Sequence, residues 1–189
     1  MQDLIKYAFD FFAHVLPGIV ILLALSLFIE DINTLDDLQA ITAKITTGVA
    51  TVLVIVGYAI GFAIYPFGRW LYRSLGFKMF GKNVENKIDM FLSDKYVMIR
   101  EKSPINFQYV ESWNQYCAMS HNFAVASLVF FTLGIYKTIF SADKMLWCLV
   151  TICSLLMFFI FIYRAVRFYH WARHDLNSTV QFLRNDDDD

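Results

Sequence analysis

The stretch RFYHWARHD, residues 167–175, places two arginines, two histidines and three aromatic rings directly after the last long apolar run of the chain. We call it, with Arg164, the C-terminal collar. Arginine binds phosphate and carboxylate groups, and tryptophan is enriched at membrane–water interfaces. The collar therefore predicts either interfacial anchoring or contact with a specific anion or protein partner. Its candidate contact residues are Arg164, Arg167, His170, Trp171, Arg173 and His174.

A second basic and aromatic group follows the second apolar run. It consists of Arg69, Trp70 and Arg73, and we call it the second collar. If both runs cross a membrane, the two collars lie at the same depth and can share a binding site.

The other polar residues do not form a recognisable catalytic set. His14 lies at the start of the first apolar run, where an anchoring and a proton-sensing role are both compatible with its position. Glu85 and Asp89 are four residues apart, which favours a solvated helix face over an acid–base pair. The three cysteines lack metal-ligand spacing, and neither a phosphate-binding glycine loop nor a zinc-protease motif is present. We predict a protein that is not an enzyme and has no cofactor or metal.

The composition indicates a membrane protein. Of the 189 residues, 58% are hydrophobic and only 17% are charged, which is too apolar for a typical soluble domain. The net charge of −1 argues against direct nucleic-acid binding. Four stretches lack Asp, Glu, Lys and Arg, namely 11–29, 45–68, 112–136 and 145–163. Each is close to the roughly 20 residues that a helix needs to cross a bilayer.

The third stretch begins with polar residues, so its membrane part should begin near residue 122. We therefore expect an all-α polytopic membrane protein of one domain, residues 1–189. Its four transmembrane helices should lie at about 11–29, 46–68, 122–140 and 145–163.

The basic residues predict the orientation. Thirteen of the 16 lysines and arginines lie at the N-terminus, between spans two and three, or after span four, and only Lys44, Lys137 and Lys144 lie on the other side. Cytoplasmic flanks are enriched in Lys and Arg. Both termini should therefore be cytoplasmic.

The polar segments predict a small cytoplasmic helical layer. Residues 69–121 should fold as helices, with a break between Gly76 and Gly81 and a short helix over 83–92. Ser103-Pro104 predicts a helix start, followed by one continuous helix to residue 140. The fourth span should continue as a helix over 164–184, before an acidic, disordered tail at 185–189. On the outer side, Thr34 and Asp37 predict a capped short helix.

Two motifs in the spans bear on packing. Pro17-Gly18 predicts a kink in the first span, either structural or a hinge. Gly57 and Gly61 form a GxxxG motif, and Ala59 and Ala63 add a second small-residue pair. Small residues let membrane helices approach closely, either within one protomer or between copies in a homo-oligomer.

Three of these segments carry a resemblance: DFFAHVLPG at 10–18, GYAIG at 57–61 and the basic aromatic helix after the last span. In this layout the chain resembles small four-span inner-membrane proteins of bacterial anti-phage systems. These include Kiwa-type membrane components and transmembrane effectors of retron and cyclic-nucleotide systems. The resemblance implies a membrane-anchored sensor or effector that works with a cytoplasmic protein partner.

Two other classes stay open. An immunity protein against a pore-forming bacteriocin would also have four spans with both ends inside. A small channel or transporter subunit is disfavoured, because intramembrane charges usually mark ion and substrate pathways.

Overall fold

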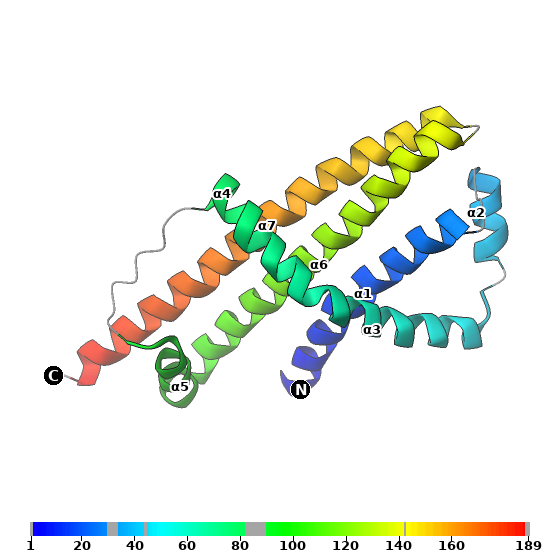
Figure 1. Cartoon of the computed structure of the whole chain (residues 1–189). Helices are drawn as coiled ribbons and strands as arrows, with labels where there is room; N and C mark the ends of the chain where they lie inside the picture. The colour runs from blue at the N-terminus through cyan, green and yellow to red at the C-terminus, as the bar shows by residue number, and fades with distance from the viewer. Residues whose placement is uncertain (1, 30–33, 44, 82–89, 142, 188–189) are drawn as a thin grey trace.

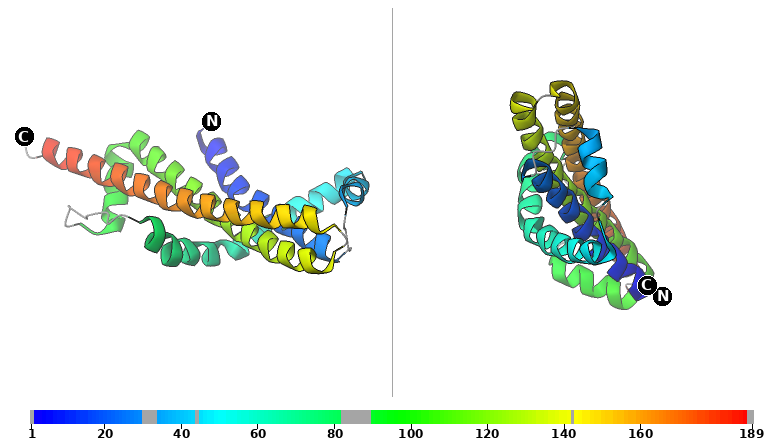
Figure 2. Two further views of the ribbon diagram at one scale, coloured as in Figure 1. Left: turned by 90° about the horizontal axis from the view of Figure 1, so that it is seen from above. Right: turned by 90° about the vertical axis from the view of Figure 1, so that its right-hand side faces the viewer.

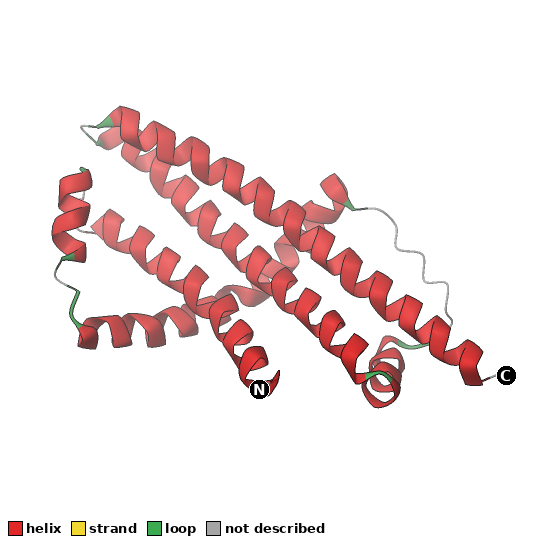
Figure 3. Ribbon diagram, turned by 180° about the vertical axis from the view of Figure 1, so that it is seen from behind, coloured by secondary structure: helices red, strands yellow, loops and turns green. Residues whose placement is uncertain are grey.

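The structure of the chain, a computed structural model, describes residues 2–29, 34–43, 45–81, 90–141 and 143–187. All regular structure in these ranges is helical (Figure 3). The helices are α1 (Gln2–Ile29), α2 (Leu35–Thr42), α3 (Thr47–Leu71), the π-helical η1 (Tyr72–Gly76), α4 (Phe77–Phe80), α5 (Leu92–Lys102), α6 (Pro104–Phe140) and α7 (Lys144–Asp187).

Four helical segments are long and apolar enough to cross a membrane, as expected of a polytopic helical protein. They are Phe11–Ile29, Thr47–Phe80, Pro104–Phe140 and Lys144–Asn185.

The long hairpin of α6 and α7 is the axis of the molecule (Figure 1). Its helices have 37 and 44 residues, which at 1.5 Å per residue corresponds to about 55 and 66 Å. Both exceed the roughly 30 Å of a bilayer hydrocarbon core. Helix α6 begins at Pro104, as the Ser-Pro pair predicts, and continues unbroken to Phe140. Helix α7 continues to Asp187, beyond the expected end near residue 184.

The second apolar helix crosses the other helices obliquely (Figure 1). A glycine lies at each crossing, because a side chain there would collide with the neighbour. A Cβ atom on Gly61 would lie 1.9 Å from the His14 carbonyl oxygen of α1, and one on Gly68 would lie 2.6 Å from the His121 Nδ1 atom of α6. A Cβ atom on Gly76 would contact the side chain of Val166 in α7 at 2.9 Å.

The expected break in this helix occurs later than Gly76. The π-helical turn η1 continues α3 into α4, and the helix ends at Phe80, before the extended Gly81. A π-helical turn adds a residue to the turn, which changes the direction of the following side chains. The helix over 83–92 predicted from sequence falls mostly on residues 82–89, with Glu85 and Asp89, which lie outside the described residues. Of the described residues in that stretch, Met90 and Phe91 are not helical, and α5 begins at Leu92.

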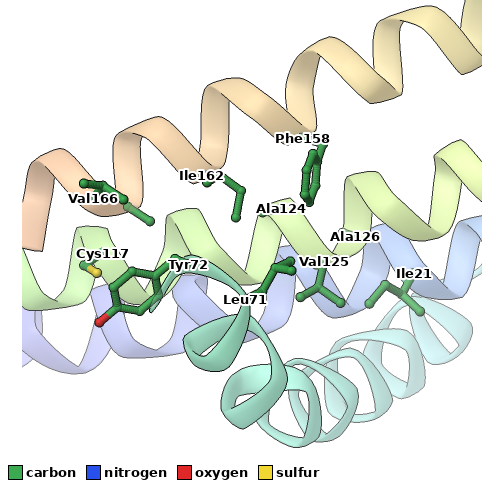
Figure 4. Packing of buried hydrophobic residues seen from close by; sticks show 11 residues of the cluster. Ile21, Leu71, Tyr72, Cys117, Ala124, Val125, Ala126, Phe158, Ile162 and Val166 are labelled. Carbon is green, nitrogen blue, oxygen red and sulfur yellow. The ribbon is translucent and has the colours of Figure 1, made fainter. Parts of the chain in front are cut away.

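The largest apolar core lies where α3 and η1 cross α1, α6 and α7 (Figure 4). Buried side chains from all of these elements meet there, including Ile21, Leu71, Val125 and Ile162. Small residues of α6, such as Ala124 and Ala126, allow the helices to approach closely.

A separate apolar core lies at the far end of the hairpin. Ile99 of α5 packs there with Val110 of α6 and with Leu176 and Val180 of α7, and all four are fully buried. We call α5 with these ends of α6 and α7 the head. The molecule is elongated, with the C-terminus at the head end and α2 at the opposite end (Figure 2).

The short helix α2 has the predicted cap. The Thr34 backbone N–H donates to Asp37 Oδ2 at 3.0 Å, and the Asp37 backbone N–H donates to Thr34 Oγ1 at 3.2 Å. This reciprocal pair satisfies two backbone donors at the helix start.

Candidate functional site

A buried polar cluster lies where α1, α3 and α6 meet. Asn122 is fully buried, and its Nδ2 donates to the Ala13 carbonyl oxygen at 3.0 Å. The Ala13 carbonyl fixes which end of the Asn122 amide faces it. If the amide were flipped, Oδ1 would face the carbonyl oxygen and no hydrogen bond could form. The Nδ2 atom also lies 3.3 Å from His14 Nδ1. Because an amide nitrogen only donates, this contact is a hydrogen bond in the tautomer whose Nδ1 accepts.

Aromatic rings from α3 and η1 extend this cluster to His121. The Tyr65 ring lies between the two imidazoles, with centroids 5.7 Å from His14 and 4.9 Å from His121. The Tyr72 ring stacks on His121 at 5.4 Å, with 10° between the ring planes. Within the described part of the chain, His121 Nδ1 and Asn122 Oδ1 are buried and lack a hydrogen-bond partner. The cluster therefore combines polar atoms and rings inside an apolar bundle.

An open groove runs along α6 from this cluster to α5. It has a volume of about 450 Å³, within the roughly 300–1,000 Å³ typical of ligand pockets. On α6, Phe107, Glu111, Gln115 and Ala118 line it, spaced at four, four and three residues. That spacing places them on one helix face over about 16 Å.

The two ends of the groove differ in character. At the bundle end, His14, Phe62 and Tyr65 line it, and all three belong to segments apolar enough to cross a membrane. At the head end, α5 contributes Tyr96 and Arg100, outside these segments. The groove therefore spans the boundary between the apolar bundle and the polar head.

Two polar contacts hold the head together. Lys95 of α5 is only 1% exposed, and its Nζ donates to Asn177 Oδ1 of α7 at 2.9 Å. Burial lowers the pKa of Lys95 from its ordinary value of 10.5, and the nearby Arg173 guanidinium lowers it further. Trp113 of α6 donates its indole N–H to Asp175 Oδ2 of α7 at 2.9 Å.

The arginines of the C-terminal collar lie over aromatic rings of their own helix. Arg164 lies 5.7 Å from the Phe168 centroid, and Arg167 lies 5.4 Å from that of Trp171. Arg173 lies 5.1 Å from the Tyr169 ring, and its Nε donates to the Tyr169 hydroxyl at 3.1 Å. These cation–π pairs are local and one turn apart.

The collar's rings face two different neighbours. Phe168 stacks on Trp113 of α6 at 5.9 Å, and Trp171 contacts the same ring at 5.1 Å. His170 is half-buried and faces Phe77 of α4 at 6.0 Å. His174 is exposed, with Nδ1 3.3 Å from Asp175 Oδ1. Much of the collar thus packs α7 against α6 and α4.

The second collar is exposed. Arg69, Trp70 and Arg73 all lie on the surface, and the Trp70 ring stacks on Phe67 at 5.7 Å. Tyr72, which precedes Arg73, contacts the C-terminal collar: its ring lies 6.2 Å from that of Tyr169.

The glycines of the first two spans pack within one chain. A Cβ atom on Gly18 would overlap the Gly57 carbonyl oxygen, at 1.8 Å, and one on Gly57 would lie 2.8 Å from Ile19. The GxxxG face thus packs on α1 beside Pro17, which lies inside that helix and is buried. Ala59 and Ala63 are exposed.

The groove is not predicted by the sequence analysis. Its signal in the sequence is the polar stretch 111–122, in which Glu111, Gln115 and Ala118 fall on one helix face. The contributions of Arg100, Tyr96 and Tyr65 had no such signal, because they come from other helices.

Comparison with known proteins finds no matching family model, curated protein or solved structure. Among the residues that the structure describes, no group of three or more His, Cys, Asp or Glu is placed to hold a metal ion. Function is therefore inferred from the groove, the head and the collars themselves.

Proposed function

We propose that the chain is a non-enzymatic bacterial inner-membrane protein. It acts as a membrane-anchored sensor or effector of an anti-phage defence system, together with a cytoplasmic protein partner. In this proposal both termini and the head are cytoplasmic. The layout resemblance supports the defence role, and the distribution of basic residues supports the orientation.

One observation carries the proposal: α6 and α7 are unbroken from the apolar bundle into the head. Buried residues of both helices form the bundle core and the head core. A partner that displaces the head must therefore shift or strain the same helices in the bundle. Because packed cores are bistable and do not deform smoothly, such a shift can pass between the two ends.

Exposed apolar side chains on the head support a protein partner. Ile105 and Tyr109 lie one turn apart on α6 and are 68% and 59% exposed. Phe91 and Phe182 add exposed rings before α5 and near the end of α7. All four lie outside the uncharged stretches of the sequence, and in the proposed orientation they belong to the cytoplasmic head. Exposed apolar side chains of this kind are typical of protein contact sites when they form a patch.

Lipid and a second copy are the proposed neighbours of the bundle. The apolar window of α3 is only 11% buried within the chain, against 44% for α1. Bilayer lipid covers the exposed surface of α3 in this proposal, and self-association uses the same surface.

A phage challenge tests the defence role. The chain is expressed in a bacterium with its neighbouring genes, and plaque formation is compared with that of cells lacking the chain. We expect protection that is lost in the double variant Ile105→Ser plus Tyr109→Ser, because the partner contact is removed. Both residues are exposed, so the variant should insert and melt like the wild type.

The matched control is Gln181→Ser, an exposed polar change on the head. It should retain protection. Absence of protection by the wild-type operon contradicts the defence role. If a neighbouring toxin gene kills cells only when this chain is deleted, the immunity-protein class takes its place.

A further inference from the structure

We propose that the second collar binds the phosphate of an anionic phospholipid, with the guanidinium groups of Arg69 and Arg73 as the hydrogen-bond donors. The inference rests on the proposed insertion of the apolar helices into a membrane and does not depend on the defence role. It follows from the place of the two arginines, from the charges of the neighbouring helices and from two aromatic rings beside them.

The two arginines lie where a bilayer presents its phosphates. Arg69 directly follows the uncharged stretch 45–68, and Arg73 lies about one turn later. Side chains four residues apart are neighbours on a helix surface, so both guanidinium groups can reach one phosphate. Both arginines are exposed, and the charge of each acts on the buried Cys117 thiol of α6, as expected of side chains on one face of the helix.

The positive charge of the second collar has no counter-charge on the helices around it. The stretches 45–81, 112–140 and 144–174 contain no Asp or Glu, and they include all of α3, η1 and α4 and the parts of α6 and α7 that pack against them. Within the described chain, neither Arg69 nor Arg73 forms an ion pair with a carboxylate. The counter-charge must therefore come from another molecule. Phosphate suits this role because a guanidinium can donate two parallel hydrogen bonds to it.

The same lack of carboxylates selects among phospholipids. A zwitterionic headgroup carries an ammonium, which would add a positive charge beside two arginines and would find no carboxylate on the neighbouring stretches. An anionic headgroup such as that of phosphatidylglycerol offers the same phosphate without the ammonium. The charges around the second collar therefore favour a lipid with net negative charge.

Two aromatic rings favour a lipid over a soluble phosphate. Trp70 and Phe67 are 60% and 46% exposed, and their rings stack at 5.7 Å beside the arginines. Exposed tryptophan is enriched at the membrane–water interface, where its ring lies at the level of the headgroups. A lipid held by its phosphate at Arg69 and Arg73 can therefore also contact these rings, and a soluble phosphate cannot.

Lipid competition on the full-length protein tests the proposal. The protein is delipidated in detergent, reconstituted with equal amounts of phosphatidylglycerol, phosphatidylethanolamine and phosphatidylcholine, and re-extracted. Retained lipid is measured by native mass spectrometry. We expect phosphatidylglycerol to be retained preferentially. The double variant Arg69→Gln plus Arg73→Gln should reduce that retention about tenfold or more, because each basic group near a membrane surface strengthens the binding of anionic lipid severalfold.

A second double variant separates a phosphate site from general attraction. Arg69→Lys plus Arg73→Lys keeps both charges and removes the planar guanidinium groups. It should retain less phosphatidylglycerol than the wild type, because lysine cannot form the paired hydrogen bonds. Retention equal to that of the wild type would show that any positive charge suffices and would overturn the site. All four substitutions are at exposed positions, and the melting temperature in detergent checks that both variants are folded.

The matched control removes two charges elsewhere. Lys102→Gln plus Arg184→Gln changes exposed residues at the ends of α5 and α7, so phosphatidylglycerol should be retained as in the wild type. An equal loss in this control would show a general effect of net charge and contradict the proposal.

The wild-type protein alone tests the choice of ligand. Equal retention of the three lipids, or preference for a zwitterionic lipid, would overturn the proposal. Glycerophosphoglycerol has the same headgroup without acyl chains, and at an equal concentration it should not displace the lipid. Displacement would mean that the arginines bind a soluble anion and that the lipid assignment is wrong.

Discussion

At the scale of single residues, Lys95 is the least expected feature of the chain. It is a lysine with 1% exposure inside a small head, hydrogen-bonded to Asn177. Burying a charged amine is unfavourable unless polar partners compensate for the lost water. The head thus holds a group whose charged form is less favourable in the folded protein than in the unfolded chain.

The charge and the volume of Lys95 can be separated by substitution. Lys95→Met keeps a long side chain and removes the buried charge, so we expect the free energy of unfolding to change by less than about 1 kcal/mol. Lys95→Ala leaves a cavity and should reduce that free energy by about 2–4 kcal/mol. Thermal unfolding of the detergent-solubilised protein provides the comparison. A Met variant as unstable as the Ala variant would show that the ammonium is essential to the head.

The difference in stability between the wild type and Lys95→Met should depend on pH, with a definite sign. Because the pKa of Lys95 is lowered in the folded state, the folded protein binds this proton less tightly than the unfolded chain. The wild type should therefore gain stability relative to Lys95→Met as the pH rises through the window just below 10.5. Below that window the difference should be constant. A wild type that loses stability relative to Lys95→Met in this window would contradict the lowered pKa.

At the scale of the elements, local signals predicted helix ends well. Ser103-Pro104 predicted where α6 starts, and the Thr34–Asp37 pair predicted the cap of α2. The oblique path of α3 had no local signal, because its direction depends on which helix each glycine meets. The π-helical turn at Tyr72–Gly76 had no local signal either, and its Gly76 packs closely against Val166 of α7. The groove is lined by four helices, and only the spacing of its α6 residues is visible in the sequence. The residues of the other three helices come together only through packing.

The crossing of α1 and α3 depends on Gly61. In Gly61→Ala the new Cβ atom would lie 1.9 Å from the His14 carbonyl oxygen, so the two helices must separate. We expect a loss of about 1–3 kcal/mol in stability, seen as a lower melting temperature in detergent. The control is Gly48→Ala near the start of α3, where the nearest atom is 4.0 Å away. This variant should be unchanged or slightly more stable, since alanine favours helix.

Loss of stability should be accompanied by an unchanged oligomeric state if Gly61 acts only within the chain. A Gly61→Ala protein that melts normally but dissociates from a larger oligomer would place this glycine at an interface between copies.

At the scale of the whole molecule, the distribution of polar residues makes the two ends different. The head has a core of its own, two polar contacts between helices, and five of the described basic residues, namely Lys95, Arg100, Lys102, Arg173 and Arg184. The opposite end has only α2 and short connections, and its few lysines include Lys137, which lies 5.9 Å from the Trp147 ring. By the positive-inside rule, this asymmetry predicts that the head end is cytoplasmic.

Single-cysteine labelling in intact cells tests this orientation. Thr34→Cys lies after the first candidate span. Ser178→Cys lies in the C-terminal part of α7, beyond the uncharged stretch 145–163, and both positions are exposed. The wild-type chain, with its three native cysteines, gives the baseline. We expect a membrane-impermeant maleimide to label Thr34→Cys in intact cells and Ser178→Cys only after lysis, because the basic head is retained in the cytoplasm. Three crossings separate the two positions, so four spans require them to lie on opposite sides. Labelling of Ser178→Cys alone in intact cells would reverse the orientation, and equal labelling of both in intact cells would contradict the four-span arrangement itself.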